Sequence, residues 1–586
     1  MNYVKEYLEA IRTGRETVGR KVRAVYEREV GWMTNPPDDF PFYFDEAEGE
    51  RPIEFIERFC RHSKGRWAGK PVLLELFQKA KIQLYFGWLE KETGLRRFRE
   101  VDDIRGRKCG KSTETAGVEL YVMIGDGEGG AEIYCVANKK DQAKLIFNEA
   151  VNMRAQSPEL RAITKKRQSD IYFPFTFSTL MALAAETKTM DGLNAHMFSQ
   201  DEWHEARDSQ LYDVMLQSQQ ARDQPIAWLI STFGFVREAF FDNKYSYASK
   251  VALWEPGFQD YRMLPLIYEL DSREEWDKPE CWAKANPGLG RIKSLTTLAD
   301  NVAKAKRDPT FLPTLLTKDF NIPENTAKAW LPYEACVNKL ITHRCEGGHQ
   351  FLIIPGEGAV CTVCGKHAEP MQLEKFLAHS YAIGGCDLSA VRDLTCATLL
   401  VRRPGDQNFY ALQHYFLPKA RVDEMEDSNT REAPYRLWAE QGHITLCEGA
   451  TVDFHDVTLW FMNMVMIYDI RPLWIGYDRA LSGYWVEEMA GEGFDMEKIA
   501  QGPFTWTYPM KELGGILEEH RVISNDNPML RWCLHNTGKK TLNKDGIESI
   551  QPVKVSDTRR IDGMVSLLNA YTCYKNHEDE FLAYVR

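Results

Sequence analysis

The chain has 586 residues, which at roughly 150 residues per domain corresponds to about two to four domains. Lys and Arg number 73 against 85 Asp and Glu, and the resulting net charge of −12 argues against a basic coat protein for nucleic acid. Apolar residues make up 44% of the chain, and no run approaches the roughly 18 consecutive apolar residues of a membrane span. We therefore expect a folded protein without a membrane segment.

Helix and strand patterns organise the first half of the chain. Residues 1–54 predict a polar helical lead, and an apolar helical pattern follows from Phe55 to Trp88. From residue 100 to about 250 the patterns alternate, with a helix at 111–124, a strand at 131–137, a helix at 141–154 and strands at 179–185 and 226–231. Such alternation is typical of a largely parallel sheet with crossover helices, so we assign residues 55–255 to one α/β domain.

A phosphate-binding loop precedes the helix at 111–124. Its residues are Arg107, Lys108, Cys109, Gly110, Lys111, Ser112 and Thr113. In such a loop Gly110 lets the backbone approach phosphate oxygens, Lys111 reaches the β and γ phosphates, and the Ser112 hydroxyl ligates Mg²⁺. The motif departs from the usual pattern because Arg105 stands where the first glycine is expected. The loop predicts binding of ATP with Mg²⁺, and a chance loop is the alternative.

Two adjacent carboxylates end a strand ninety residues further on. The stretch from Leu193 to Ser199 leads into Asp201 and Glu202. In an ATPase Asp201 would hold the Mg²⁺ shell and Glu202 would polarise the attacking water. An isolated Asp-Glu pair is more often an exposed turn, but the preceding phosphate loop favours the catalytic interpretation. Ser231 and Thr232 end a later strand, where a hydroxyl could sense the γ-phosphate.

A connecting subdomain and a Cys/His cluster are predicted in the middle of the chain. Residues 256–335 are rich in Trp and Pro, and residues 336–372 hold a cluster of Cys and His. The spacing of two knuckles would supply four ligands to a structural, tetrahedral Zn²⁺ site, namely Cys345, His349, Cys361 and Cys364. His367 or His343 could replace His349, and reduced cysteines in a loop are the alternative.

Residues 373–586 predict an RNase H-like domain. Three strands come first, at Ile383–Leu388, Thr395–Val401 and Phe409–Phe416, followed by a helix at Phe454–Tyr468, a strand at Leu473–Tyr477 and a helix at Ile561–Tyr574. Three antiparallel strands followed by helix, strand and helix are the order of that fold.

Three aspartates lie at strand and helix ends of this second α/β region. Asp387 lies in the first strand, Asp478 ends the later strand, and Asp562 begins the final helix. Cleavage of a phosphodiester by two metal ions needs several converging carboxylates, so these three predict a Mg²⁺ or Mn²⁺ site. Each one alone could be a turn residue or an acid in the first turn of a helix. Asp393 is a secondary candidate.

The order of these motifs resembles that of the large subunit of tailed-bacteriophage terminases. The resemblance covers roughly residues 70–575 and includes Phe77-Gln78, the phosphate loop, Asp191-Gly192-Leu193-Asn194 before Asp201-Glu202, Ser231-Thr232 and the three aspartates. It implies a P-loop ATPase of the RecA or ASCE kind that drives translocation of double-stranded DNA, and a nuclease that cuts concatemeric DNA. It also implies that Gln78 contacts adenine and that Ser231 and Thr232 couple hydrolysis to motion.

The resemblance also implies partners and a location. It suggests a homo-oligomeric ring on a portal protein, a small terminase subunit that selects the DNA, and activity in the cytoplasm of an infected bacterium rather than in the mature virion. A trans-acting arginine finger is not evident; Lys188, Arg154 and Arg222 are candidates.

Two other classes of protein share some of these features. A helicase or a restriction or repair translocase with a nuclease domain also has a phosphate loop and an Asp-Glu pair, but no second set of RecA-like motifs follows residue 250. A structural or portal-binding adaptor with vestigial sites is the third possibility.

Overall fold

The computed structural model divides into two compact units, residues 1–323 and 324–586, and each is described by itself. The description covers the chain apart from residues 185–191, 207–208, 236–239, 309, 326–328, 355–358, 390–393, 421, 423–432, 479–482, 545–546, 556–558 and 586. Among the residues that are described, no helix is long and apolar enough to cross a membrane.

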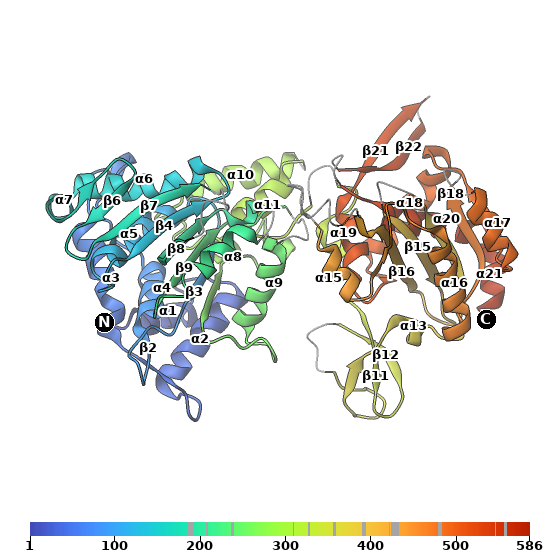
Figure 1. The fold of residues 1–586 in the computed structure, drawn as a ribbon, viewed down its shortest axis with the longest axis horizontal. Coiled ribbons are helices and arrows are strands. Elements are labelled where there is room, and N and C mark those ends of the chain that lie inside the picture. The colour runs from blue at the N-terminus through green and yellow to red at the C-terminus, as the bar shows by residue number, and fades with distance from the viewer. Residues whose placement is uncertain are drawn as a thin grey trace. The chain divides into compact units, whose positions relative to one another are not determined.

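An eight-stranded sheet forms the centre of the first unit (Figure 1). Its strands, in spatial order, are β10 (Met263–Ile267), β3 (Glu100–Ile104), β9 (Ile226–Ser231), β8 (Ala195–Asp201), β4 (Glu132–Ala137), β7 (Ser178–Ala184), β6 (Asp170–Phe173) and β5 (Lys165–Lys166). The first six run parallel, and β6 and β5 are antiparallel additions at one edge. The predicted parallel sheet is confirmed.

Helices cover this sheet. They are α1 (Tyr3–Arg12), α2 (Arg20–Thr34), α3 (Glu46–Phe59), α4 (Leu76–Gly87), α5 (Lys111–Ile124), α6 (Lys140–Gln156), α7 (Pro158–Ile163), α8 (Gln210–Gln217), α9 (Phe240–Leu253), α10 (Leu295–Arg307) and α11 (Leu312–Phe320). The continuous helical pattern expected from Phe55 to Trp88 is instead two helices, because Gly65, Gly69 and Pro71 interrupt it between α3 and α4. A short antiparallel pair consists of β1 (Phe42–Phe44), which precedes α3, and β2 (Trp88–Glu90), which follows α4.

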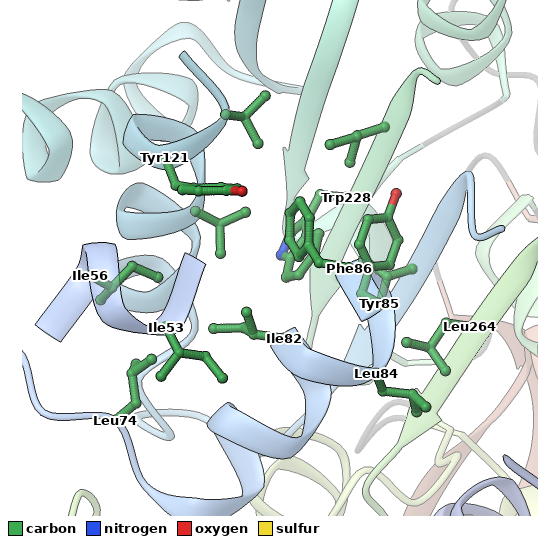
Figure 2. Packing of buried hydrophobic residues seen from close by; sticks show 14 of the residues in the cluster. Ile53, Ile56, Leu74, Ile82, Leu84, Tyr85, Phe86, Tyr121, Trp228 and Leu264 are labelled. Carbon is green, nitrogen blue, oxygen red and sulfur yellow. The ribbon is translucent and has the colours of Figure 1, made fainter. Parts of the chain in front are cut away.

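The N-terminal helices are part of the core of the first unit. Ile53 and Ile56 of α3 pack near Ile82 and Phe86 of α4, with Trp228 of β9 in the same cluster (Figure 2). Buried apolar residues of α1 and α2, among them Val4, Tyr7, Val22 and Val25, belong to that cluster too. Residues 1–54 therefore share the core of the α/β domain and do not form a separate lead.

The segment 256–335, expected to connect two domains, is divided by the structure. Its strand β10 pairs in parallel with β3, so it completes the sheet of the first unit. Helices α10 and α11 form a small core of their own around Leu298, Leu315 and Phe320. Local sequence patterns do not show which strand a parallel strand pairs with. The pairing of β10 with β3 could therefore not be predicted.

The second unit is built on a sheet of RNase H-like order. Its main path is β17 (Ile444–Cys447), β16 (Phe409–Pro418), β15 (Thr395–Val401), β14 (Tyr381–Asp387), β18 (Arg471–Asp478) and β19 (Met496–Ile499), and β20 (Val522–Ile523) pairs with β16. Strands β14, β15 and β16 are antiparallel neighbours, and β18 and β19 run parallel to β14.

The remaining elements of the second unit pack around this sheet. They are α12 (Tyr333–Cys336), α13 (Leu373–Phe376), α15 (Tyr435–Glu440), α16 (Phe454–Tyr468), α17 (Gly483–Gly491), α18 (Pro503–Glu518), α19 (Pro528–Asn536), α20 (Asp562–Asn576), α21 (Glu578–Tyr584) and the hairpin of β21 (Thr537–Lys544) and β22 (Ile547–Lys554). Helix α20 lies directly on β14 because Gly385 has no side chain: a Cβ there would stand 2.4 Å from the carbonyl oxygen of Ser566.

A small three-stranded sheet carries the Cys/His cluster. It consists of β12 (Gln350–Ile353), β11 (Ile341–Cys345) and β13 (Ala368–Pro370), all antiparallel. Its apolar cluster is small, with Cys345, Cys361 and Ala368 as the buried members. A module with so little apolar burial needs another source of stability.

Candidate functional site

The phosphate loop joins the end of β3 to the start of α5. Gly110 immediately precedes α5 with φ +79°, a conformation that suits glycine, and Lys108 has φ +65°. Gly106 is also required, because a Cβ at that position would stand 2.3 Å from Asn286 Oδ1. Ser112 and Thr113 lie in the first helical turn, where backbone N–H groups are free to bind an anion.

The predicted phosphate lysine is held by the loop itself. Lys111 Nζ donates hydrogen bonds to the carbonyl oxygens of Arg105 at 2.6 Å and Gly106 at 3.3 Å. Its side chain is buried, and burial lowers the pKa of Lys111. Carbonyl oxygens of the loop thus accept hydrogen bonds from the ammonium group that would bind phosphate.

Arg105, which replaces the usual first glycine, anchors a buried charge network under the loop. Its guanidinium pairs with Asp103 at 2.7 Å and Glu114 at 3.0 Å, and Lys81 Nζ contacts both carboxylates as well. All four side chains are at most 2% exposed. Although burial alone would raise it, Arg105 and Lys81 hold the pKa of Asp103 below its usual value. Arg105 therefore departs from the motif as a member of a structural ion-pair network. The sequence alone did not reveal this network.

Gln78 lies beside the phosphate loop, with both ends of its amide bonded within the protein. Its Nε2 donates to Glu114 Oε2 at 3.0 Å, and its Oε1 accepts the backbone N–H of Glu75 at 3.0 Å, which closes a capping box at the start of α4. A Cβ on Gly110 would be 3.6 Å from its Nε2. The contact with adenine stays a prediction.

Asp201 is the last residue of β8 and Glu202 follows it, and the single strand β9 separates β8 from β3. Burial and the charge of Glu202 raise the pKa of Asp201 to about 7, and Lys111 is near enough to lower it in part. Glu202 has φ +50°, so it leaves the strand direction abruptly. The sheet thus brings the predicted Mg²⁺ ligand and the predicted hydrolytic carboxylate to the edge that carries the phosphate loop.

His204 links the Asp-Glu pair to two other segments. Its Nδ1 lies 3.0 Å from Glu202 Oε2 and 2.9 Å from Ser231 Oγ, and its Nε2 lies 2.5 Å from Lys318 Nζ of α11. Thr232 Oγ1 is 3.5 Å from the same Glu202 oxygen. Ser231 and Thr232 therefore lie next to Glu202, as predicted sensor residues would. The contact with Lys318 was missed, since nothing in the sequence connects positions 114 residues apart.

Two of the three arginine-finger candidates are engaged elsewhere. The guanidinium of Arg154 donates to the Thr164 hydroxyl and carbonyl. Arg222 pairs with Glu128 and bonds the carbonyl of Asn194, which precedes β8 at the end of the sheet opposite Asp201. Lys188 falls outside the described residues.

Glu119 of α5 is a buried acid behind the Asp201 strand. It accepts hydrogen bonds from Ser199 Oγ at 2.5 Å and Cys135 Sγ at 3.3 Å. Burial raises the pKa of Glu119 from 4.5 to about 7. The carboxyl group of Glu119 therefore stays protonated to a higher pH in the folded chain than in the unfolded chain. Its contribution to the free energy of unfolding is fully present below about pH 4.5 and is lost as the pH rises through about 7.

We expect Glu119→Gln to stabilise the first unit at pH 8, by up to about 3 kcal/mol, and much less at pH 4.5. The amide is nearly isosteric and carries no charge to desolvate at the higher pH. Urea unfolding of the full chain, followed at both pH values, measures the difference. Glu54→Gln, at an exposed position of α3, is the control and should show no such pH dependence. An equal effect of Glu119→Gln at both pH values would refute the assignment.

The three predicted aspartates of the second unit share one face of its sheet. Asp387 is opposite Cys396 of β15, and Asp478 is opposite Ile499 of β19; both partners belong to the apolar cluster that includes α20. Asp562 is the first residue of α20 itself. The structure thus brings two strand ends and a helix start together on the face that α20 covers.

A buried hydrogen-bond network fixes the start of α20 over the sheet. Gln413 Nε2 donates to the carbonyl of Gly563 at 2.7 Å, and Tyr415 O–H donates to Gln413 Oε1 at 2.6 Å. Ser566 Oγ donates to the carbonyl of Gly385 at 3.0 Å. These bonds hold the first turns of α20 against β14 and β16.

The aspartates do not form one tight metal cluster. Among the described residues, two groups of Cys, His, Asp or Glu place one ligand atom each within 4.8 Å of all the others, and these three aspartates are not among them. At least one pair of their carboxylates is therefore further apart. Two ions about 4 Å apart require ligands spread over such a span. Asp393 lies outside the described residues.

The Cys/His cluster has the spacing of a tetrahedral site. Cys345 Sγ lies 3.6 Å from Cys364 Sγ and 3.6 Å from His349 Nδ1, and Cys361 Sγ lies 3.7 Å from His349 Nδ1. With Zn–S near 2.3 Å and Zn–N near 2.0 Å, tetrahedral ligands are about 3.6 Å apart. His349 joins the three sulfurs in the four-residue group, which includes neither His343 nor His367.

The fold and these sites together define a P-loop ATPase followed by an RNase H-like nuclease. The family model "Terminase large subunit, ATPase domain" matches residues 76–250, and "Terminase large subunit, endonuclease domain" matches residues 258–349 and 368–578. The endonuclease match alone covers more than half of the chain, so the chain belongs to the terminase large subunit family. It is an ATPase and an endonuclease, the two activities of a phage DNA-packaging motor.

Individual relatives extend over most of the chain. The terminase large subunit of Enterobacteria phage HK97 is 26% identical over 532 residues, 89% of this chain and 94% of that protein. That of Lactococcus phage p2 is 22% identical over 452 residues, 74% of this chain and 75% of that protein. The crystal structure of the HK97 large terminase aligns with a TM-score of 0.45 and 23% identity, over 89% of this chain and 99% of that one.

The resemblance seen in the sequence is confirmed, and neither the helicase nor the adaptor alternative finds support. The endonuclease match leaves out residues 350–367, which include Cys361 and Cys364. The gap therefore divides the Cys/His module, since Cys345 and His349 lie within the matched residues.

Proposed function

We propose that this chain converts ATP hydrolysis into movement of double-stranded DNA into a procapsid and cuts concatemeric DNA at a two-metal nuclease site. One observation carries the proposal. A single chain combines Lys111 and the Asp201-Glu202 pair at one sheet edge with three aspartates on one face of an RNase H-like sheet.

The ATPase residues divide the work by position. Lys111 and the loop from Arg107 to Thr113 bind the phosphates, Ser112 and Asp201 hold Mg²⁺, and Glu202 orients the attacking water. Bound Mg²⁺ would neutralise charge on the phosphates. His204 contacts Glu202, Ser231 and Lys318, and Lys318 belongs to α11. A change at Glu202 on hydrolysis would therefore be transmitted to α11. This contact is the route by which Ser231 and Thr232 would couple hydrolysis to motion.

The nuclease residues are Asp387, Asp478 and Asp562. Carboxylate oxygens suit Mg²⁺ or Mn²⁺, and ions bound there would activate the attacking water and stabilise the leaving oxygen. The hydrogen bonds of Gln413 and Ser566 hold α20 to the sheet, which keeps Asp562 in register with the two strand ends.

Partners and location follow from the proposed role. Double-stranded DNA is the substrate, a homo-oligomeric ring of this chain would act on a portal protein, and a small terminase subunit would present the DNA. The site of action would be the cytoplasm of the infected bacterium, with no copy retained in the mature virion.

The test separates the two activities in the full chain. We expect DNA-stimulated ATP hydrolysis to be lost in Lys111→Ala, while plasmid cutting with Mg²⁺ or Mn²⁺ is retained. Asp387→Ala should show the reverse pattern. If both variants match the wild type in both assays, the proposed sites are wrong.

For the Cys/His module we propose a structural Zn²⁺ held by Cys345, His349, Cys361 and Cys364. All four ligands come from the protein, which leaves no open position for a substrate. The sulfur and nitrogen spacings close to 3.6 Å support this assignment.

Cys361→Ser is expected to lower the zinc content of the purified full chain by one equivalent. The oxygen of Ser is a poorer ligand than a thiolate, and the module buries too little apolar surface to hold the site without it. Metal analysis of native protein measures the loss. Cys281→Ser, in the first unit, is the control, and equal zinc in both variants would remove the site.

A further inference from the structure

A second group of metal-binding side chains lies in the nuclease unit, apart from the Cys/His module. Glu497 of β19 and two residues from the C-terminal end of α20, Cys573 and His577, place one ligand atom each within 4.8 Å of the others. Glu497 Oε2 lies 2.8 Å from His577 Nε2 and 3.2 Å from Cys573 Sγ.

The ligand atoms are held in place from outside the group. The imidazole of His577 stacks on the indole of Trp474, with ring centroids 4.1 Å apart and an angle of 5° between the planes. The other oxygen of Glu497 accepts a hydrogen bond from Asn576 Nδ2 at 2.7 Å. These contacts fix both rotamers before any ion binds, as supporting residues do in known metal sites.

Glu580 lies near the second ring nitrogen of the histidine. Its carboxylate lies 3.8 Å from His577 Nδ1, on the side of the ring away from Glu497. A histidine that binds a metal through Nε2 carries its proton on Nδ1, and a carboxylate at that position is the usual acceptor. At 3.8 Å the carboxylate of Glu580 is beyond direct hydrogen-bond distance, and a rotation of its exposed side chain would bring it within reach of Nδ1.

The group also has the size and access of a metal site. In a tetrahedral zinc site N and O ligands are about 3.3 Å apart and S and O ligands about 3.6 Å, so the three side chains need to separate by only about half an ångström. Cys573 is buried, whereas the side chains of Glu497 and His577 are each 25% exposed. An ion can enter from the exposed side, where a water would complete its coordination.

We propose that Glu497, Cys573 and His577 form a Zn²⁺ site with three protein ligands and one water. Mixed sulfur, nitrogen and oxygen donors select zinc over magnesium, which takes oxygen ligands only. Binding releases the thiol proton of Cys573 and moves the imidazole proton from Nε2 to Nδ1. The ion joins the end of α20 to β19, whose neighbour β18 ends at Asp478. It therefore clamps the helix that begins with Asp562.

The test counts zinc in the purified full chain after loading with Zn²⁺ and removal of free ion. Cys573→Ser and His577→Gln should each contain one equivalent less than the wild type. Cys361→Ser, which affects the Cys/His module, should lose a different equivalent, so that combining it with His577→Gln lowers the content by two. Cys60→Ser removes a buried thiol of the first unit and is the matched control.

The effect on zinc affinity distinguishes Glu580, a positioning residue, from the three ligands. Glu580→Gln should keep the full zinc content but weaken binding at this site by about 10-fold in competition with a chelator. His577→Gln replaces a side chain that is 25% exposed, so it tests the site even if Cys573→Ser fails to fold. Zinc content and affinity equal to wild type in His577→Gln would overturn the proposal. The measurement involves neither ATP hydrolysis nor DNA cutting, so its outcome is independent of the proposed function.

Discussion

Replacing Glu202 with Gln is expected to reduce ATP hydrolysis by about 100- to 10,000-fold while ATP binding is retained. The amide keeps the size of the side chain but cannot take a proton from water or orient it with a negative charge. Glu202 follows β8 beside His204 and Thr232 and is not part of the phosphate loop, so the backbone N–H groups that bind phosphate are unchanged. Steady-state hydrolysis with DNA, together with binding of a labelled ATP analogue, measures the two effects separately.

Glu205→Gln is the matched control for this change. Glu205 lies three residues further on, and its carboxylate bonds Gln142 Nε2 at 3.1 Å instead of the sensor residues. Its hydrolysis rate should stay within a few fold of the wild type. If Glu202→Gln and Glu205→Gln lose ATP hydrolysis equally, the assignment of Glu202 as the catalytic carboxylate is wrong and the Asp-Glu pair is only an acidic turn.

Local patterns predicted the elements that carry the ATPase motifs. The helix at 111–124 and the strand at 226–231 have the bounds that the structure gives to α5 and β9. Each lies next to a strong signal, a glycine before the helix and the Ser231-Thr232 pair at the end of the apolar strand. Strand β3 was not recognised, because its Glu100, Asp102 and Asp103 make a buried strand look like a charged loop.

The order of strands could not be obtained in the same way. β9 lies between β8 and β3, although 121 residues separate the end of β3 from the start of β9 in the chain. Parallel pairing depends on long-range contacts that leave no local pattern. The ion pairs of Arg105 with Glu114 and of His204 with Lys318 were missed for the same reason.

The nuclease site shows which residues a sequence can and cannot indicate. Asp387, Asp478 and Asp562 were predicted because each stands at the end of an apolar or glycine-rich run. Their supporting residues, such as Gln413, were not, since a polar residue inside a strand pattern looks like any residue on a solvated face. Glu497 and Cys573 lie 76 positions apart and meet only because α20 crosses the sheet.

Asp562→Asn is expected to lower metal-dependent DNA cutting by at least about 100-fold and to leave ATP hydrolysis unchanged. Losing a residue that merely supports a metal ligand costs about 10- to 100-fold, and a ligand itself should cost no less. Asp562 is 5% exposed and sits on a helix that Gln413 and Ser566 hold against the sheet, so Asn keeps the fold but not the charge. Plasmid cutting over a range of Mg²⁺ and Mn²⁺ concentrations measures the loss.

The control tests the simplest structural explanation of this aspartate. An acid in the first turn of a helix stabilises it through the helix dipole, and Asp579 has that position in α21 with an exposed side chain. Asp579→Asn should therefore cut DNA like the wild type. Equal cutting by both variants would mean that Asp562 serves only its helix. A loss confined to Asp562→Asn, with thermal unfolding unchanged, would place its carboxylate with Asp387 and Asp478 at the metal ions.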